Sequence, residues 1–157
     1  MNGKVLATCI SERKGTKKHP VFEISLKENC GIIGDAHAVD ASTPIPYRHR
    51  QVSLLADESV DTMRQKGLTL QAGDFAENIL TAGIQLKSLP IGTRMIVGEA
   101  ELEVTQIGKE CHSDCEIRRL SGHCVMPMEG IFAIVIRGGR IRPGDKIQIK
   151  EANHEAH

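Results

Sequence analysis

The stretch RMIVGEAELEVT, residues 94–105, carries the pattern that decides the fold. From Ala100 to Thr105 apolar and polar residues alternate, which is typical of a β-strand with one buried face. Gly98 and Glu99 can turn the chain between this run and the apolar residues before it. The two runs are therefore predicted to form a β-hairpin, and an antiparallel sheet is expected at this point.

Strand patterns also occur on both sides of this hairpin. Residues 131–136, IFAIVI, are apolar throughout and rich in β-branched side chains, as expected of a strand covered on both faces. Residues 146–150 alternate, and Ile147 and Ile149 are predicted to point inward. Further strands are predicted at residues 4–10, 21–26 and 51–55. Many short strands separated by turns favour a closed β-barrel.

The sequence predicts few helices. One is expected to begin at Asp57, whose side chain can cap it, and to end at Gly67. A shorter turn of helix is predicted from Asp74, where the Asp74 carboxylate would accept the amide of Glu77 while the Glu77 side chain reaches back. The predicted fold class is therefore mainly β, a closed β-barrel with one or two peripheral helices.

Length and charge exclude several classes of function. A chain of 157 residues fits one domain, and its 20 basic and 20 acidic residues cancel. There is no general electrostatic attraction to nucleic acid or membrane, and with one Tyr and no Trp few rings can stack on bases. We expect neither partner. The start MNGKVLATCI turns polar too quickly for a signal peptide, so a cytoplasmic location is expected.

The cysteines leave three interpretations open. A reducing compartment would keep all five as thiols: Cys9, Cys30, Cys111, Cys115 and Cys124. Cys111 and Cys115 enclose His112, and His123 and Cys124 follow, which offers enough donors for zinc at a spacing that matches no standard zinc motif. Buried free cysteines are common, but polar neighbours place Cys111 in a loop, where a thiolate can attack or bind metal.

Two further motifs each allow a structural and a functional interpretation. In GIIGDAHA, residues 31–38, Asp35 can cap a tight turn, or Asp35 and His37 can face one ligand together. In RHRQ, residues 48–51, the basic side chains can be solvated or can hold an anion through the fork of an arginine.

Taken in order, five stretches resemble the MOSC domain, named for the C-terminal domain of molybdenum cofactor sulfurases. They are GIIGDAHA (31–38), RQVSLL (50–55), GDFAENI (73–79), LPIGTRMIVGEAELEVTQIGKEC (89–111) and MEGIFAIVIRGGRIRPGD (128–145). The resemblance implies a MOSC domain over residues 1–150, of the small stand-alone bacterial type, followed by a polar tail at 151–157. It also implies a β-barrel similar to the barrel domain of pyruvate kinase.

The same resemblance implies a cofactor and a set of site residues. MOSC domains are linked to molybdenum cofactor (molybdopterin), and the key cysteine of the family falls on Cys111, as a molybdenum ligand or as a sulfur carrier. Asp35 and His37 would line the pocket and Arg50 would contact the pterin or its phosphate. The family pattern makes Glu77 and Asn78 a polar wall.

The functions implied by the resemblance differ in their partners. The chain is expected to carry, sulfurate or deliver molybdenum cofactor, with molybdoenzymes or cofactor-biosynthesis proteins as partners. The alternative is the catalytic subunit of a molybdenum-dependent reductase of N-hydroxylated compounds, which needs an electron-donor protein. A zinc-stabilised or plain β-barrel interaction module is a further alternative. Many relatives have a basic residue where Ile134 stands, and whether Arg137 replaces it is left open.

Overall fold

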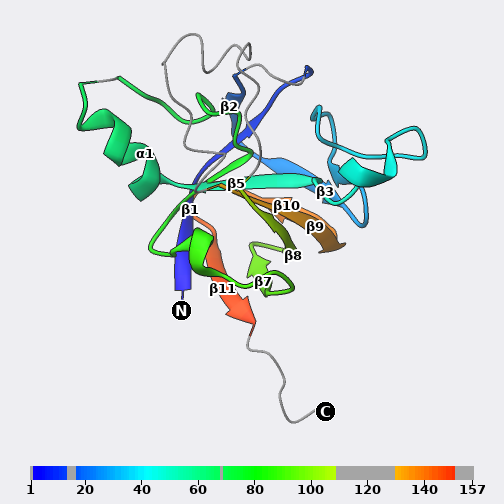
Figure 1. Cartoon of the computed structure of the whole chain (residues 1–157). Helices are drawn as coiled ribbons and strands as arrows, with labels where there is room; N and C mark the ends of the chain where they lie inside the picture. Colours follow the sequence, from blue (N-terminus) through cyan, green and yellow to red (C-terminus); the bar gives the residue numbers. More distant parts are fainter. Residues whose placement is uncertain (1, 14–16, 68, 109–129, 151–157) are drawn as a thin grey trace.

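The computed structural model describes residues 2–13, 17–67, 69–108 and 130–150 (Figure 1). Its strands are β1 (Asn2–Ile10), β2 (His19–Val21), β3 (Ile24–Lys27), β4 (Gly31–Ile32), β5 (Val52–Ala56), β6 (Ile79–Ala82), β7 (Arg94–Val97), β8 (Ala100–Ile107), β9 (Ile131–Arg137), β10 (Gly139–Ile141) and β11 (Lys146–Lys150). The described part contains one α-helix, α1 (Asp57–Arg64), and two 3-10 turns, η1 (Ile45–Tyr47) and η2 (Leu86–Ser88).

Seven strands close into a barrel, which confirms the predicted fold class. They follow the order β11-β7-β8-β9-β5-β6-β1, and β1 also pairs with β11. All of these pairs are antiparallel except β5 with β6, which are parallel because α1 lies between them in the chain. The strand β2 extends the sheet at β1, and β10, β3 and β4 form a separate small sheet.

The apolar side chains that alternate along the strands fill the interior of the barrel. On β8 the residues Ala100, Leu102 and Val104 are fully buried in the main core. The core also contains inward-facing residues of the other strands, among them Val5, Leu54, Ile79, Ala133 and Ile147. Each large apolar side chain buried in this way contributes about 1.5–3 kcal/mol, so these residues dominate the stability of the barrel.

A second apolar cluster lies outside the barrel, between the sheet and α1. It consists of Leu55, Val60, Met63, Phe75, Ala76, Leu80 and Phe132. The strand β9 therefore buries Ile131 inside the barrel and Phe132 outside it, with exposures of 0% and 1%. This confirms that IFAIVI is covered on both faces, at least at its start. Figure 1 shows α1 outside the barrel at the end of β5.

The helix termini differ from the sequence prediction. The N-cap of α1 is Ala56, with no side-chain hydrogen bond, and Asp57 is the first helical residue. Its carboxylate accepts from Arg64 Nη1 at 2.9 Å instead, and it still favours the positive end of the helix dipole. Gly67, with a φ of 92°, follows the last turn as expected.

The predicted turn of helix at Asp74 is absent, since residues 72–75 form turns only. The Asp74 carboxylate accepts from the amide of Gln71 at 2.9 Å rather than from that of Glu77. Glu77 does reach back, to the amide of Gly73 at 2.6 Å. The predicted strand at 21–26 is also divided, because β2 ends at Val21 and β3 joins the other sheet. In the described ranges no helix has the length and apolar character needed to cross a membrane.

Candidate functional site

A β-bulge at the end of β8 shapes one rim of the barrel. Val104 faces Ala133 and Gln106 faces Phe132, so Thr105 is an extra residue between two paired positions. The hydroxyl of Thr105 donates to the carbonyl oxygen of His49 at 2.6 Å. Bulges beside functional sites commonly redirect a side chain, and this one fixes the segment before β5 against the end of β8.

Gln106 joins the two basic residues of this segment. Its Oε1 atom lies 2.6 Å from His49 Nε2 and accepts from Arg50 Nε at 2.9 Å. Its Nε2 group donates to the carbonyl oxygen of Gly108 at 2.6 Å. The carboxamide of Gln106 therefore connects the RHR motif to Gly108, the last described residue after β8. All three contacts are partly buried, so water competes with them only weakly.

Phe132 brings Arg50 and His37 together. The Arg50 guanidinium carbon lies 5.6 Å from the centroid of the Phe132 ring, a cation–π distance. The His37 ring meets the same ring edge to face, with centroids 6.0 Å apart and an interplanar angle of 77°. Two segments that the sequence nominated separately thus converge on the outward face of β9.

Asp35 is buried and organises the loop that carries His37. Its Oδ1 atom accepts from Lys18 Nζ at 2.8 Å and from the amide of Ser11 at 3.0 Å. Its Oδ2 atom accepts from the amide of His37 at 2.9 Å. Burial alone would raise the pKa of Asp35, but hydrogen bonds from His37 and the charge of Lys18 hold it well below its usual range. Asp35 is therefore an ionised anchor behind His37.

Glu77 is buried in a different environment, 1% exposed and close to the buried thiol of Cys9. Its carboxylate accepts from the amides of Gly73 at 2.6 Å and Phe75 at 3.2 Å. Desolvation outweighs these hydrogen bonds and raises the pKa of Glu77 to about 7. Desolvation also raises the pKa of Cys9 to about 12, so this thiol stays protonated.

The raised pKa of Glu77 predicts a pH-dependent stability. The folded protein binds this proton more tightly than the unfolded chain, whose carboxyl has a pKa near 4.5. The stabilisation is complete below the unfolded value and is lost as the pH rises through about 7. Between about pH 4.5 and 8 Glu77 should lower the free energy of unfolding by about 3 kcal/mol.

The matched control is Glu77→Gln, which cannot ionise. Urea unfolding of both proteins at about pH 5 and pH 8 should show the wild type losing stability relative to the variant as the pH rises. Other titrating groups are common to the two proteins and cancel in the difference. Parallel pH curves would contradict the prediction.

Asn78 is fully buried and joins three strands of the barrel. Its Oδ1 atom accepts from the amide and the hydroxyl of Ser53 at 3.0 and 3.1 Å. Its Nδ2 group donates to the carbonyl oxygen of Cys9 at 3.1 Å. These contacts tie β1 and β5 to the start of β6. The structure therefore gives Asn78 and Glu77 anchoring contacts, whereas His37 and Arg50 meet at Phe132 and Asp35 holds the backbone of His37.

The prediction for Cys111 lies outside the described residues, as does the alternative of a zinc site that includes Cys115, His123 and Cys124. The flanking glycines are described. The amide of Gly108 donates to the carbonyl oxygen of Gly130 at 2.7 Å, and Gly108 also accepts from Gln106. The two described residues that flank the segment containing Cys111 therefore lie together, and Gly108 is joined through Gln106 to Arg50. The described ranges contain no group of three His, Cys, Asp or Glu residues that could hold a metal.

Arg137 lies at the other end of β9. It faces Glu101 at the start of β8, and its Nη1 atom is 3.9 Å from the Glu101 carboxylate. An extended strand rises about 3.3 Å per residue, so Arg137 lies roughly 20 Å from the Ile131 end. Arg137 therefore does not bring a basic side chain to the rim at Gln106. It does not replace the basic residue that many relatives have at the position of Ile134.

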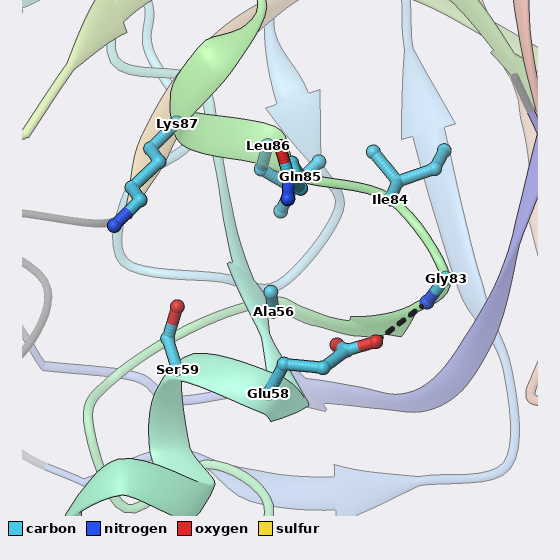
Figure 2. A pocket seen from close by; sticks show the side chains of 8 residues that line it. All are labelled: Ala56, Glu58, Ser59, Gly83, Ile84, Gln85, Leu86 and Lys87. Atoms are coloured by element: carbon cyan, nitrogen blue, oxygen red, sulfur yellow. Dashed lines mark hydrogen bonds between the residues drawn. The ribbon is translucent and has the colours of Figure 1, made fainter.

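A separate hollow of about 450 Å³ lies between the start of α1 and η2 (Figure 2). It is lined by Ala56, Glu58, Ser59, Gly83, Ile84, Gln85, Leu86 and Lys87. Figure 2 shows the Glu58 carboxylate directed at Gly83, whose amide donates to it at 2.8 Å. None of the predicted site residues lines this hollow.

Three residues that support the predicted site residues were not singled out in the sequence. Phe132 belongs to an apolar run, and only the barrel shows that it points outward. Gln106 ends an alternating strand, and its role depends on the bulge at Thr105. No sequence signal marks Lys18 as the partner of Asp35, because the two residues belong to different loops.

Comparisons with known proteins agree with this architecture. A comparison with curated proteins found no significant match. Among solved structures, the YuaD protein from Bacillus subtilis is similar with a TM-score of 0.80 and 20% identity, covering 98% of each chain. YiiM from Geobacillus stearothermophilus has a TM-score of 0.69 and 18% identity over 98% of this chain and 78% of its own. YiiM from Escherichia coli has a TM-score of 0.66 and 18% identity, over 97% and 71%.

At these identities the solved structures show the shared fold alone. The family follows from the sequence model of the MOSC domain, which matches residues 34–148. The match begins just before Asp35, ends within β11 and covers well over half of the chain. It includes His37, Arg50 and Phe132, the three residues that meet at the rim. The protein therefore belongs to the MOSC domain family.

Proposed function

We propose that this MOSC protein binds molybdenum cofactor and carries, sulfurates or delivers it, with Cys111 as the functional thiol. The observation that carries the proposal is the convergence of His37 and Arg50 at the rim where Gly108 and Gly130 bound the segment containing Cys111. Ligand sites draw polar groups from distant segments to one place, and this rim does so.

The donors at the rim suit the phosphate end of the cofactor. The planar guanidinium of Arg50 matches the geometry of a phosphate, and His49 contacts the same acceptor, Gln106 Oε1. The cofactor itself would supply molybdenum held by dithiolene sulfurs, a soft centre for which a cysteine thiolate is a suitable ligand. The residues present therefore fit an anionic, sulfur-rich ligand.

The protein's own residues would bind and orient this ligand. Contact with Phe132 and the hydrogen bond to Gln106 restrict the rotamers of Arg50 before any ligand arrives, which lowers the entropic cost of binding. Asp35, ionised and paired with Lys18, fixes the backbone at His37. Gly108, with a φ of 68°, directs the chain into the next segment with a backbone geometry that favours glycine.

Arg50→Leu is expected to weaken retention of the cofactor. Losing one charge-assisted contact to phosphate costs about 1.5–3 kcal/mol, or roughly a ten- to hundredfold loss of affinity. Arg48→Leu is the matched control, because Arg48 is exposed and donates to carbonyl groups of its own loop, at Thr43 and Ala41. The measurement is molybdenum per chain in protein purified anaerobically from a host that makes the cofactor.

The outcome separates the candidate functions. Stoichiometric molybdenum in the wild type and in Arg48→Leu, with depletion in Arg50→Leu, supports the proposal. Zinc without molybdenum would favour the interaction module and overturn it. Turnover of an N-hydroxylated base by the molybdenum-loaded protein with a chemical reductant would identify the reductase alternative.

A further inference from the structure

The outward side of five neighbouring barrel strands, β1, β11, β7, β8 and β9, is rich in basic side chains. Side chains alternate along a strand, so the residues between the core positions point outward here. Among the described residues of this side, which we call the basic face, the acidic ones are Glu101 and Glu103, buried and half-buried. The exposed basic ones are Lys4, Arg94, Arg137, Lys146 and Lys150. Because the whole chain has no net charge, this excess of positive charge is local.

Glu101 gathers three of these cations around one buried carboxylate. Its side chain is only 6% exposed although it points out of the barrel. Lys150 Nζ and Arg94 Nη1 lie 3.5 and 3.6 Å from its Oε2 atom, and Arg137 Nη1 lies 3.9 Å from its Oε1 atom. The three cations remain about half exposed, at 53%, 46% and 58%. Cations from three strands therefore cover one anion and direct their remaining charge toward solvent.

Lys4 and Lys146 lie directly opposite each other at the seam between β1 and β11. Both are exposed, and within the described ranges neither forms an ion pair with an acidic side chain. Like charges directly opposite on one face of a sheet repel each other and destabilise the strand pair. In the closed barrel the paired seam is no longer a free edge that these charges protect. A bound acidic group would replace this repulsion with attraction.

Aliphatic side chains lie between the charges of the basic face. Ile96 faces Glu101 and Ile134 faces Glu103 across neighbouring strands, and both isoleucines are half-buried. Phe132, the aromatic ring on the outward side of β9, is buried in the cluster under α1. Among the described residues the basic face therefore exposes no ring that can stack on a nucleic-acid base. Basic charge mixed with aliphatic side chains is typical of a surface that contacts protein.

We propose that the basic face is a docking surface for an acidic segment of a partner protein. Glu101 sets the spacing of Arg94, Arg137 and Lys150, and the opposed Lys4 and Lys146 add a second group of positive charge. Charge complementarity of this kind raises the rate of association and selects among partners. The inference needs no cofactor and does not depend on the proposed function.

The test uses the whole protein and a labelled peptide of about ten glutamates. Four strand spacings of about 4.8 Å separate β1 from β9, so a peptide of this length, at about 3.3 Å per residue, spans the basic face. Fluorescence anisotropy at low ionic strength should show binding. The affinity should fall as salt is raised to about 0.15 M, where the Debye length is about 8 Å. In amide NMR spectra the peptide should shift resonances of β1, β11 and β7.

Lys4→Gln combined with Lys146→Gln should weaken peptide binding by about two- to thirtyfold, as expected for the loss of two exposed ion pairs. The midpoint of thermal unfolding should not fall, because the repulsion between the two lysines is removed. Lys27→Gln combined with Lys66→Gln is the matched control. It removes the same charge from exposed positions on β3 and after α1, and it should bind the peptide as the wild type does.

Failure of the wild type to bind the peptide at low salt would overturn the proposal, even if a variant failed to fold. Equal weakening in the two double variants would also overturn it, because the attraction would then be non-specific. Unweakened binding in the Lys4 and Lys146 variant would show that these lysines only protect strand edges. Tighter binding of an oligothymidylate, or of phosphatidylserine vesicles, with loss in the same variant would assign the basic face to nucleic acid or to a membrane instead.

Discussion

Replacing Cys111 with serine is expected to reduce the molybdenum content of the purified protein to the background of the host. Serine preserves the size of the side chain but exchanges a soft thiolate for a hydroxyl that does not ionise near pH 7. Loss of a residue that only supports a metal ligand already costs about 10- to 100-fold in affinity, so loss of the proposed ligand itself should cost at least as much. Folding should survive the change.

Two other cysteines provide controls for this result. Cys30 is half-buried in the small sheet region, and Cys30→Ser should retain both the fold and the molybdenum. Cys115→Ser tests the neighbouring thiol and should leave the chemistry largely intact. Thermal unfolding and molybdenum content are measured together for all variants in one host. Normal molybdenum in Cys111→Ser with loss only in Cys115→Ser would show that the functional thiol is the other one.

Lys18→Met is expected to destabilise the fold by about 3–5 kcal/mol, the cost of leaving one partner of a buried ion pair uncompensated. The Lys18 and Asp35 side chains are 1% and 0% exposed, and their charged atoms are 2.8 Å apart. Without the cation, the Asp35 carboxylate keeps only hydrogen bonds such as those from the amides of Ser11 and His37. The midpoint of thermal unfolding should fall by roughly 10 °C or more.

A double-mutant cycle measures the pair itself. Asp35→Asn alone leaves Lys18 without its counter-ion, whereas Lys18→Met with Asp35→Asn removes both charges together. The double variant should recover part of the loss, so the two single effects should exceed the combined effect by more than about 1 kcal/mol. Matched control data come from Lys17→Met, because Lys17 is 43% exposed and its nearest acidic atom, on Asp74, is 3.8 Å away. Strict additivity would show that Lys18 acts through packing alone.

The barrel was predictable because its strands repeat one simple pattern. Alternation at Ala100 to Thr105 and the apolar run at 131–136 specify which side chains face the core without knowledge of their partners. The missing helix at Asp74 has the opposite cause. Its two capping residues bind local amides in a turn, with Asp74 accepting from Gln71 and Glu77 from Gly73, and Glu77 is buried beside Cys9 of β1. Such long-range burial leaves no periodic signal.

The sequence predicted several residues of the candidate site, but it did not predict which other residues they contact. The family motifs pointed to His37 and Arg50, which do meet, although through Phe132 rather than directly. The role of Asp35 as a capping carboxylate was one of two open interpretations, and its amide contacts support it. Gln106 acquires its role from an extra residue in β8, and a bulge of one residue cannot be recognised in an alternating sequence of this length.

The pairing of β1 with β11 also governs the order in which the barrel can assemble. Asn2 lies opposite Gln148 and Lys4 opposite Lys146, so this seam joins strands from the two ends of the fold. Until β11 has left the ribosome, β1 and β7 each present an unpaired edge that other nascent chains could extend. Lysines at positions 4, 146 and 150 place charge along these strands, which discourages such pairing. Closure is therefore a late step, completed only after the final strand is available.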